Sequence, residues 1–422
     1  MECNKNTIIF DTVKEALNDS NITLTTNDVT SLLVWRDLIS PVIKYNKIRP
    51  WQIINRIPFS NVLCLKVPLS IILRDGQKQF PSYIDFIPET FILPDEFELF
   101  EKEVIKVKEQ AEEESKQHHE TSTNENENFN SDSNDNTTGQ FKVKEEFFIK
   151  PSNGSLGNGI KILKTGEMID KNYYCYQNKK QKNSIENLNV QNQCPAVAQR
   201  YIKAHLIDDT KFDLRIYVLV SSVEPFEIFV YRDGLARFCS VKSHIDSIFA
   251  QITNVTMNKR SAFFNKPEQI SRLISDVFDE NFSQEQQEKI WSQIDDLIVL
   301  TFFCSHRYLL KGRDQFIPNY FRGTNDRFFY SKSFQIFGFD ILLREIDLKP
   351  FLIEVNYRPS LDFLRNCERR MKVDMIKGAL KIAAPYIPFQ KLVKARQWSW
   401  SLTLWEEELN SHPELFQRAL EL

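Results

Sequence analysis

Residues 334–357 read FQIFGFDILLREIDLKPFLIEVNY, and this stretch predicts a β-hairpin. Two apolar runs, residues 334–343 and 349–357, flank a short polar segment centred near Asp347. Apolar runs of this length on either side of a polar turn are typical of two antiparallel strands. The hairpin fixes which side chains of the two strands face each other.

Three polar side chains of this hairpin predict a magnesium site. With the turn near Asp347, Asp340 lies opposite Glu354, with Cβ atoms about 5 Å apart. Glu354 and Asn356 share a strand face, because side chains alternate along a strand. Mg²⁺ prefers hard oxygen ligands, which two carboxylates and the Asn356 carbonyl would supply. The alternative is a protonated or water-bridged carboxylate pair, which would be costly between strands as apolar as these.

A second charged strand face lies upstream. Strands are predicted over residues 213–220 and 226–231, and Lys211, Asp213 and Arg215 alternate with apolar residues. The three therefore share one face. Taken alone, such a face favours a solvated outer surface. The acidic hairpin weakens that interpretation.

A glycine-bearing loop joins two further predicted strands, residues 147–150 and 160–163. It holds three of the chain's 11 glycines: Gly154, Gly157 and Gly159. Glycine lets backbone amides approach an anion closely, and Lys150 adds a positive charge at the loop's entry. The loop lacks the Gly-Lys-Ser/Thr of a P-loop, and no helix follows as in a dinucleotide-binding turn. It indicates a flap over phosphates or, alternatively, a plain surface hairpin.

Composition narrows the class of protein. The chain has 422 residues, of which 42% are hydrophobic, and a net charge of −3, which argues against general nucleic-acid binding. Its seven cysteines form no CxxC pair or zinc spacing, which favours free thiols in a reducing compartment. We expect neither a signal peptide nor a membrane span. The sequence therefore predicts a cytoplasmic protein without nucleic-acid or membrane partners.

Mixed patterns along the chain predict an α+β (α/β) fold. Residues 61–67 are strand-like, and residues 288–303 have the apolar spacing of a helix. Beyond Cys367 the pattern is helical, with one apolar face formed by Val373, Ile376, Leu380 and Ala383. The chain divides into residues 1–63, 64–197, 198–366 and a helical tail, 367–422.

Two polar inserts interrupt the second of these parts. Residues 106–140 are almost all Glu, Lys, Gln, Asn, Ser and Thr, and such a stretch buries too little apolar surface to fold. Residues 102–117 have helical charge spacing, whereas the Asn-rich residues 121–139 are predicted to be disordered. A second polar loop covers residues 177–193.

The chain resembles the tubulin tyrosine ligase-like family through an ordered set of short motifs. They are WQIINRIP (51–58), PETFILP (88–94), IKP (149–151) with GNGI (157–160), QRYI (199–202), KFDLRIYVLV (211–220), YRDGLARF (231–238), TN (253–254) with NK (258–259), FGFD (337–340), and LKPFLIEVN (348–356) with PSL (359–361). Each is short, but together and in this order they are specific.

The resemblance implies an ATP-grasp fold, in which two α+β subdomains hold ATP between β-sheets, with a small N-terminal domain. It also implies roles for individual residues. The ATP-binding residues it implies are Lys66, Lys150, Gly157, Gly159, Gln199, Arg200, Ile202, Lys211 and Asp213. The catalytic residues it implies are Lys211, Arg215 and Glu354, the Mg²⁺ ligands are Asp340, Glu354 and Asn356, and the residues that hold the amino acid or the acceptor are Arg237, Thr253, Asn254 and Lys259.

The resemblance further implies an ATP-dependent ligase that adds glutamate to glutamate side chains of the α- or β-tubulin tail through an acyl-phosphate. Its expected location is the cytoskeleton, with the cilium or basal body included, and an accessory subunit is expected. Two departures concern the substrate pocket: many members have His at Gln251, and Ser at Arg358. A tubulin glycylase, a ligase for another protein, and an inactive tubulin-binding or ciliary-complex pseudoenzyme are the alternatives.

Overall fold

The computed structural model describes residues 2–4, 8–26, 31–37, 52–124, 144–152, 154, 159–170, 195–224, 226–316 and 333–383. It contains both helices and strands, so the mixed class is confirmed, and it forms two compact units. Some predictions fall outside the described residues: those on Gly157, residues 125–140 of the insert, the loop 177–193, and residues 384–422 of the tail. The four-part division of the chain stays a prediction.

The larger unit comprises the described parts of Met1–Cys64, Ile72–Phe86 and Ala204–Leu422. It has a four-stranded parallel sheet in the order β2-β1-β3-β4 and a six-stranded antiparallel sheet in the order β12-β11-β10-β13-β14, with β9 paired to β10. The strands are β1 (Glu2–Asn4), β2 (Thr23–Thr25), β3 (Leu33–Val34), β4 (Ile53–Ile54), β9 (Leu206–Ile207), β10 (Thr210–Val223), β11 (Phe226–Phe238), β12 (Ser271–Leu273), β13 (Gln335–Leu343) and β14 (Pro350–Asn356). The helices are α1 (Asp11–Asp19), η2 (Ser60–Leu63), part of α2 (Lys66–Gln79), η4 (Ile248–Ala250), α5 (Val255–Asn258), η5 (Pro267–Gln269), α6 (Ile274–Asn281), α7 (Gln284–Phe316) and α8 (Asn366–Ala383).

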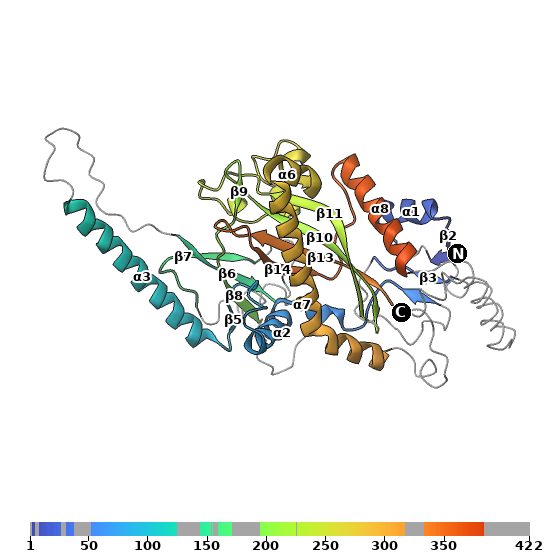
Figure 1. The fold of residues 1–422 in the computed structure, drawn as a ribbon, viewed down its shortest axis with the longest axis horizontal. Helices are drawn as coiled ribbons and strands as arrows, with labels where there is room; N and C mark the ends of the chain where they lie inside the picture. The colour runs from blue at the N-terminus through green and yellow to red at the C-terminus, as the bar shows by residue number, and fades with distance from the viewer. Residues whose placement is uncertain are drawn as a thin grey trace, which may run out of the picture. The chain divides into compact units, whose positions relative to one another are not determined.

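The predicted hairpin is confirmed. β13 and β14 pair antiparallel, and Asp340 lies opposite Glu354. The two upstream strands are also confirmed and are longer than predicted, because β10 and β11 together extend from Thr210 to Phe238. Both faces of β10 are buried almost throughout, so this strand forms the centre of the sheet (Figure 1).

Helices cover the two faces of the six-stranded sheet. On one face Phe302 of α7 packs against Phe337 and Phe339 of β13, with ring centroids 5.4 and 5.5 Å apart. Residues along β13 alternate between faces, so Gly338 and Asp340 point to the opposite side. The helix predicted over 288–303 is therefore confirmed as part of α7 and covers the apolar side of the sheet.

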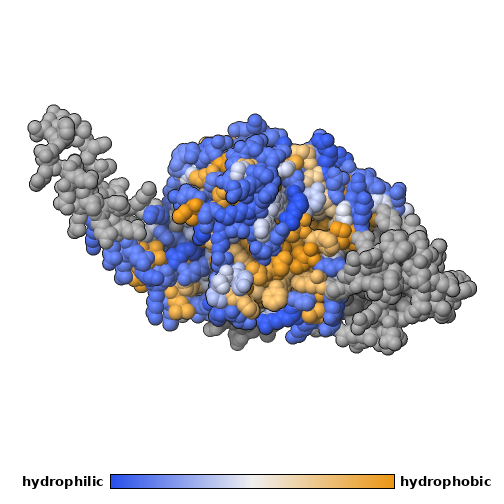
Figure 2. Space-filling model, in the orientation of Figure 1, coloured by the Kyte–Doolittle hydropathy of each residue, from blue (hydrophilic) through white to orange (hydrophobic). Residues whose placement is uncertain are grey.

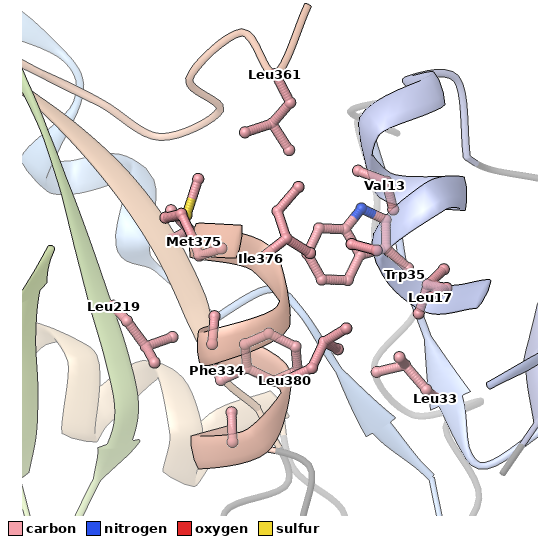
Figure 3. Packing of buried hydrophobic residues seen from close by; sticks show 14 of the residues in the cluster. Val13, Leu17, Leu33, Trp35, Leu219, Phe334, Leu361, Met375, Ile376 and Leu380 are labelled. Atoms are coloured by element: carbon pink, nitrogen blue, oxygen red, sulfur yellow. The ribbon is translucent and has the colours of Figure 1, made fainter. Parts of the chain in front are cut away.

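α8 completes a second core in the larger unit. Its predicted apolar face is confirmed, since Val373, Ile376, Leu380 and Ala383 are all buried. Figure 3 shows side chains of α8 meeting those of α1 and β10, with the indole of Trp35 among them. Burying one aliphatic side chain of this size contributes roughly 1.5–3 kcal/mol. This cluster holds α1 and β3 against α8.

Part of α7 also remains at the surface. In the orientation of Figure 1, hydrophobic residues gather near the middle of the displayed face (Figure 2). α7 itself carries exposed Val299 and Phe303, whose exposed fractions are 50% and 64%.

Across the described residues, no helix is long and apolar enough to cross a membrane.

The smaller unit comprises the described parts of Leu65–Ile71 and Ile87–Lys203. Its antiparallel sheet has the order β5-β8-β6-β7. Its elements are β5 (Thr90–Leu93), α3 (Phe97–Asn124), β6 (Glu145–Pro151), β7 (Lys161–Lys164) and β8 (Ala196–Arg200). β6 and β7 confirm the two strands predicted on either side of the glycine loop. Phe100 of α3 packs edge-on against Phe147 of β6, with ring centroids 5.1 Å apart.

Two local predictions are wrong. Residues 61–67 form no strand, because η2 covers Ser60–Leu63 and α2 begins at Lys66. Pro68 lies in the first turn of α2, where proline fits a helix, and this signal outweighs the apolar alternation. The helix predicted over residues 102–117 is confirmed as part of α3, which continues to Asn124, so the disorder predicted for the insert is wrong for residues 106–124. Pairs such as Lys108 and Glu112, 3.9 Å apart, support this helix.

Candidate active site

Four strands of the six-stranded sheet bring charged residues onto one face. Arg215 of β10 lies opposite Asp340 of β13, which in turn lies opposite Glu354 of β14. On the other side of β10, Asp213 lies opposite Arg237 of β11. Directly opposed side chains share a face of the sheet. Residues far apart in the sequence, such as Arg215 and Asp340, which are 125 positions apart, are therefore neighbours.

Two arginines and two aspartates form a continuous ion-pair network on this face. Arg215 donates from Nε to Asp340 Oδ1 at 2.5 Å and from Nη2 to Oδ2 at 3.0 Å. Arg237 donates to Asp213 in the same bidentate way, at 2.7 and 2.5 Å. The Nη2 atom of Arg237 also lies 2.8 Å from Asp340 Oδ2. Bidentate pairs of this kind are strong and fix the orientation of both partners.

The network is buried, which determines its electrostatics. The four side chains are exposed by 10% or less. Burial alone would raise the pKa of Asp340, but the charges of Arg215 and Arg237 outweigh it and hold that pKa well below its usual range. Burial would likewise lower the pKa of Arg237, but Asp213 and Asp340 raise it well above its usual value. Both groups are therefore charged at neutral pH.

The interpretation of Lys211, Asp213 and Arg215 as a solvated face is wrong. Their exposed fractions are 5%, 5% and 8%. The Lys211 Nζ donates to Gln251 Oε1 at 3.5 Å, and the Thr253 hydroxyl donates to Asp213 Oδ2 at 2.6 Å. Charges this deeply buried need partners, and neighbouring strands and the loop after β11 supply them.

The three predicted magnesium ligands come together at one end of this network. Asn356 Nδ2 donates to Asp340 Oδ2 at 3.1 Å and to Glu354 Oε1 at 3.2 Å. Asp340 is 2% exposed, whereas Glu354 is only half-buried and therefore accessible from solvent. Across the described residues, no group of three or more His, Cys, Asp and Glu side chains is arranged to hold a metal. A metal here would depend on the Asn356 amide together with the two carboxylates.

The predicted amino-acid-binding residues are only partly brought together. Arg237 and Thr253 belong to the network, but the Asn254 side chain accepts from Met257 N and so caps α5. Lys259 follows α5 and is exposed. The fully buried Asn258 was not predicted; its side chain bonds Ser240 N at 2.7 Å and Ile252 O at 2.7 Å and so fixes this loop.

Two glycines that the sequence analysis did not single out make room for Arg215. A Cβ added at Gly338 would lie 3.0 Å from Arg215 Cδ and 2.9 Å from Pro359 Cβ. A Cβ added at Gly234 would lie 2.2 Å from Arg215 O. A glycine inside a strand often marks such a close approach, so the Phe-Gly-Phe-Asp motif carried a usable signal.

The smaller unit holds a separate set of predicted residues. The Lys150 ammonium, on a residue only 7% exposed, donates to Gln199 Oε1 at 2.6 Å, and Gln199 Nε2 donates to Thr90 Oγ1 at 3.5 Å. Lys66 donates from Nζ to Gly154 O at 3.0 Å, so it contacts the start of the glycine loop. Gly159 has a φ of +74°, which favours glycine at this position.

Arg200 and Ile202 are also predicted to bind ATP, but the Arg200 side chain pairs with two glutamates. The Arg200 guanidinium pairs with Glu89 at 2.7 Å and with Glu103 at 2.5 Å, and lies 4.6 Å from the Phe147 ring centroid. Side chains alternate along β8, so Arg200 points away from the face that carries Gln199. Ile202 follows β8 and is half-buried.

Comparison with known proteins agrees with these motifs. Residues 44–392 match the tubulin-tyrosine ligase family model. Relatives include tubulin polyglutamylase TTLL7 of Homo sapiens, 27% identical over 84% of this chain and 35% of the relative. Tubulin polyglutamylase TTLL11 of Mus musculus is 32% identical over 73% of this chain and 37% of the relative. Tubulin polyglutamylase ttll6 of Danio rerio is 27% identical over 82% and 38%. The chain thus spans little more than a third of the length of each of these relatives. Because the family model matches most of the chain, the chain belongs to the tubulin-tyrosine ligase family.

Proposed function

We propose that this protein is an ATP-dependent carboxylate–amine ligase with an ATP-grasp fold that adds glutamate to glutamate side chains in the α- or β-tubulin tail. The observation that carries the proposal is the buried charged face of the six-stranded sheet, where Asp340 is held by two guanidinium groups beside Glu354 and Asn356. The names of the relatives, all tubulin polyglutamylases, support glutamate and tubulin as substrates.

Asp340, Glu354 and Asn356 offer the types of ligand that magnesium prefers, but Asp340 already accepts from Arg215, Arg237 and Asn356, so a metal would have to displace part of this network. Mg²⁺ binds through one or two carboxylates together with phosphate oxygens and water, and this set offers two carboxylates and an amide. Because the Asn356 amide nitrogen faces the carboxylates, its carbonyl would have to rotate towards them to act as a ligand. When bound, the ion would supply Lewis-acid stabilisation of the transferring phosphoryl group.

The proposed reaction has two steps. First, a side-chain carboxylate oxygen of the acceptor attacks the γ-phosphorus of ATP, ADP leaves, and an acyl-phosphate forms. The amine of free glutamate then attacks the acyl carbon, phosphate leaves with the bonding electron pair, and the new amide nitrogen loses a proton. No nucleophile from the protein is required, so the protein's part is to position anionic reactants and stabilise their charge.

The buried cations of the larger unit suit this task. We propose that Lys211 and Arg215 stabilise the charge that develops during transfer, with Glu354 as the third catalytic residue. Because Arg215 is already fixed by Asp340, its charge needs little reorganisation during the reaction. Arg237, Thr253, Asn254 and Lys259 are proposed to hold the incoming amino acid or the acceptor.

We propose that the residues contacting the nucleotide are Lys66, Lys150, Gly157, Gly159, Gln199, Arg200, Ile202, Lys211 and Asp213. The buried bond between Lys150 and Gln199 supports this assignment, because it holds an ammonium group beside a second residue of the proposed set. Arg200 would contribute through its backbone, since its side chain pairs with two glutamates.

Glycine transfer, a protein acceptor other than tubulin and a binding role without catalysis are less well supported, because the three relatives named above are called tubulin polyglutamylases. We further propose a cytoskeletal location, including the cilium or basal body, and an accessory protein subunit.

Intact-mass analysis tests the proposal. Tubulin is incubated with the protein, Mg-ATP and one of glutamate, glycine or tyrosine. We expect mass steps of one glutamate residue, absent without ATP; steps with glycine alone would overturn the assignment of the donor. With ¹⁸O in the acceptor carboxylate, an acyl-phosphate predicts one ¹⁸O atom in the released phosphate, and unlabelled phosphate would exclude that intermediate.

A further inference from the structure

A pocket in the larger unit lies at the start of β13 and just after β14, the two strands that carry the candidate magnesium ligands. Its walls come from the residues after β3 and β4, the start of β13 and the segment after β14. It has a volume of about 320 Å³, counting the open space at its mouth. Trp35, Phe334 and Leu361 form an apolar wall, and all three belong to the cluster in Figure 3.

The carboxylate in this pocket is already satisfied. Asp37 Oδ2 accepts from the backbone nitrogens of Ile9 and Phe10 at 2.9 and 3.3 Å, and Oδ1 accepts from Trp35 Nε1 at 2.8 Å. Phe10 is the N-cap residue of α1, so this carboxylate also lies at the positive end of a helix dipole. Its charge is therefore stabilised by hydrogen bonds from Trp35 and from the start of α1.

Two guanidinium groups line the same pocket. Arg358 is half-buried and donates from Nη1 to the backbone oxygen of Asp37 at 2.6 Å. Within the part of the chain that the structure describes, no carboxylate forms an ion pair with Arg358. Arg56 is 4% exposed, and its guanidinium lies 5.5 Å from the Tyr357 ring centroid. An anion entering the pocket would be attracted to the charge of Arg358.

A buried glutamine ties the pocket to the active-site strands. Gln335, with 0% exposure, donates from Nε2 to Tyr357 O at 2.8 Å, while its Oε1 accepts from Ile57 N and Ser60 Oγ at 2.9 and 2.8 Å. Arg358 follows Asn356 by two residues, which span at most about 7 Å. An extended peptide has the same spacing between alternate side chains.

We propose that this pocket binds the carboxylate of an acidic residue that neighbours the modified glutamate in the acceptor chain, and that Arg358 is its main contact. The inference rests on the proposed function. Such a contact would make the protein selective for acceptor glutamates that have acidic residues beside them, because the charge of the neighbouring residue contributes to binding. The apolar wall would pack against the methylene groups of the same side chain.

The test is a double-mutant cycle between the protein and its acceptor. Two synthetic peptides contain one acceptor glutamate flanked by either glutamates or glutamines, and each is assayed with the parent protein and Arg358→Gln. With the glutamate-flanked peptide, the substitution is expected to raise KM roughly tenfold, as for one charged hydrogen bond. With the glutamine-flanked peptide, we expect no change. Fluorescence anisotropy without ATP measures the same coupling independently of catalysis.

The matched control is Arg232→Gln, which removes an exposed arginine that pairs with Asp295 and should leave both peptides unaffected. An equal loss of binding for both peptides, or a rise in KM for free glutamate instead of the peptide, would overturn the proposal. If the parent protein transfers no amino acid, the proposed function fails, and the pocket is then tested by anisotropy alone. Weaker binding of only the glutamate-flanked peptide to Arg358→Gln would support the site, and unchanged binding of that peptide would refute it.

Discussion

Arg237→Gln is predicted to cost a large part of the stability of the larger unit. The guanidinium of Arg237 lies between Asp213 and Asp340, and donates to both. Without it, two buried carboxylates lose a shared counter-ion, although Asp213 keeps the Thr253 hydroxyl and Asp340 keeps Arg215. Removing one partner of a buried ion pair typically costs about 3–5 kcal/mol. We expect a loss of unfolding free energy in that range at pH 7.

The cost should depend on pH in a definite direction. The pKa of Asp340 is lowered in the folded protein, so its stabilising contribution is complete above the unfolded value of about 3.9 and is lost as pH falls through the folded value. Without Arg237, burial is less well opposed and the folded pKa of Asp340 rises. The variant's deficit in unfolding free energy should therefore shrink as pH is lowered from 7 towards about 4.

Urea unfolding followed by tryptophan fluorescence measures both effects. Arg232→Gln is the matched control, because its pair with Asp295 is at the surface and should contribute less than about 1 kcal/mol. A loss below about 1 kcal/mol for Arg237→Gln at pH 7 would refute the view that this arginine neutralises the network. A deficit that stays constant with pH would refute the assignment to Asp340.

Three further predictions follow from the geometry. Gly338→Ala displaces Arg215 and should lower kcat roughly tenfold. The control is Gly378→Ala in α8, where an added Cβ meets nothing within 4 Å and should raise the unfolding free energy by about 0.5–1 kcal/mol. Equal kcat values for the two variants would contradict the role of Gly338. Thr253→Val removes a buried hydrogen bond and should cost about 1–3 kcal/mol in urea unfolding, with recovery in Thr253→Ser; no loss would contradict the bond's role. Lys150→Met should weaken ATP binding at least about tenfold by calorimetry, and Lys106→Met on exposed α3 should not; matching affinities would remove Lys150 from the nucleotide site.

The acidic hairpin was predictable from sequence because its determinants are local. Two apolar runs and one polar turn set the register, which places Asp340 opposite Glu354. The face shared by Lys211, Asp213 and Arg215 also followed from alternation along a strand. The burial of this face could not be predicted, because exposure depends on which elements cover a strand. Three charged residues on one strand face normally indicate a solvated surface.

The ion-pair network was beyond local reasoning. Arg215 pairs with Asp340 across 125 residues, and Arg237 joins two aspartates on different strands. Such contacts depend on the order of strands in the sheet, which no short pattern specifies. The start of α2 was missed for a different reason: residues 61–67 alternate like a strand, but a short apolar run does not distinguish strand from helix.

The most direct test of the account compares two glutamates of the same hairpin. Glu354 faces Asp340, whereas Glu345 is exposed in the turn between β13 and β14. Glutamate transfer to tubulin is measured by mass for Glu354→Gln and Glu345→Gln over a range of Mg²⁺ concentrations. The account predicts that Glu354→Gln loses nearly all transfer or needs far more Mg²⁺, while Glu345→Gln behaves like the parent. Unchanged transfer and Mg²⁺ dependence in Glu354→Gln would contradict the central claim that this sheet face is the catalytic site.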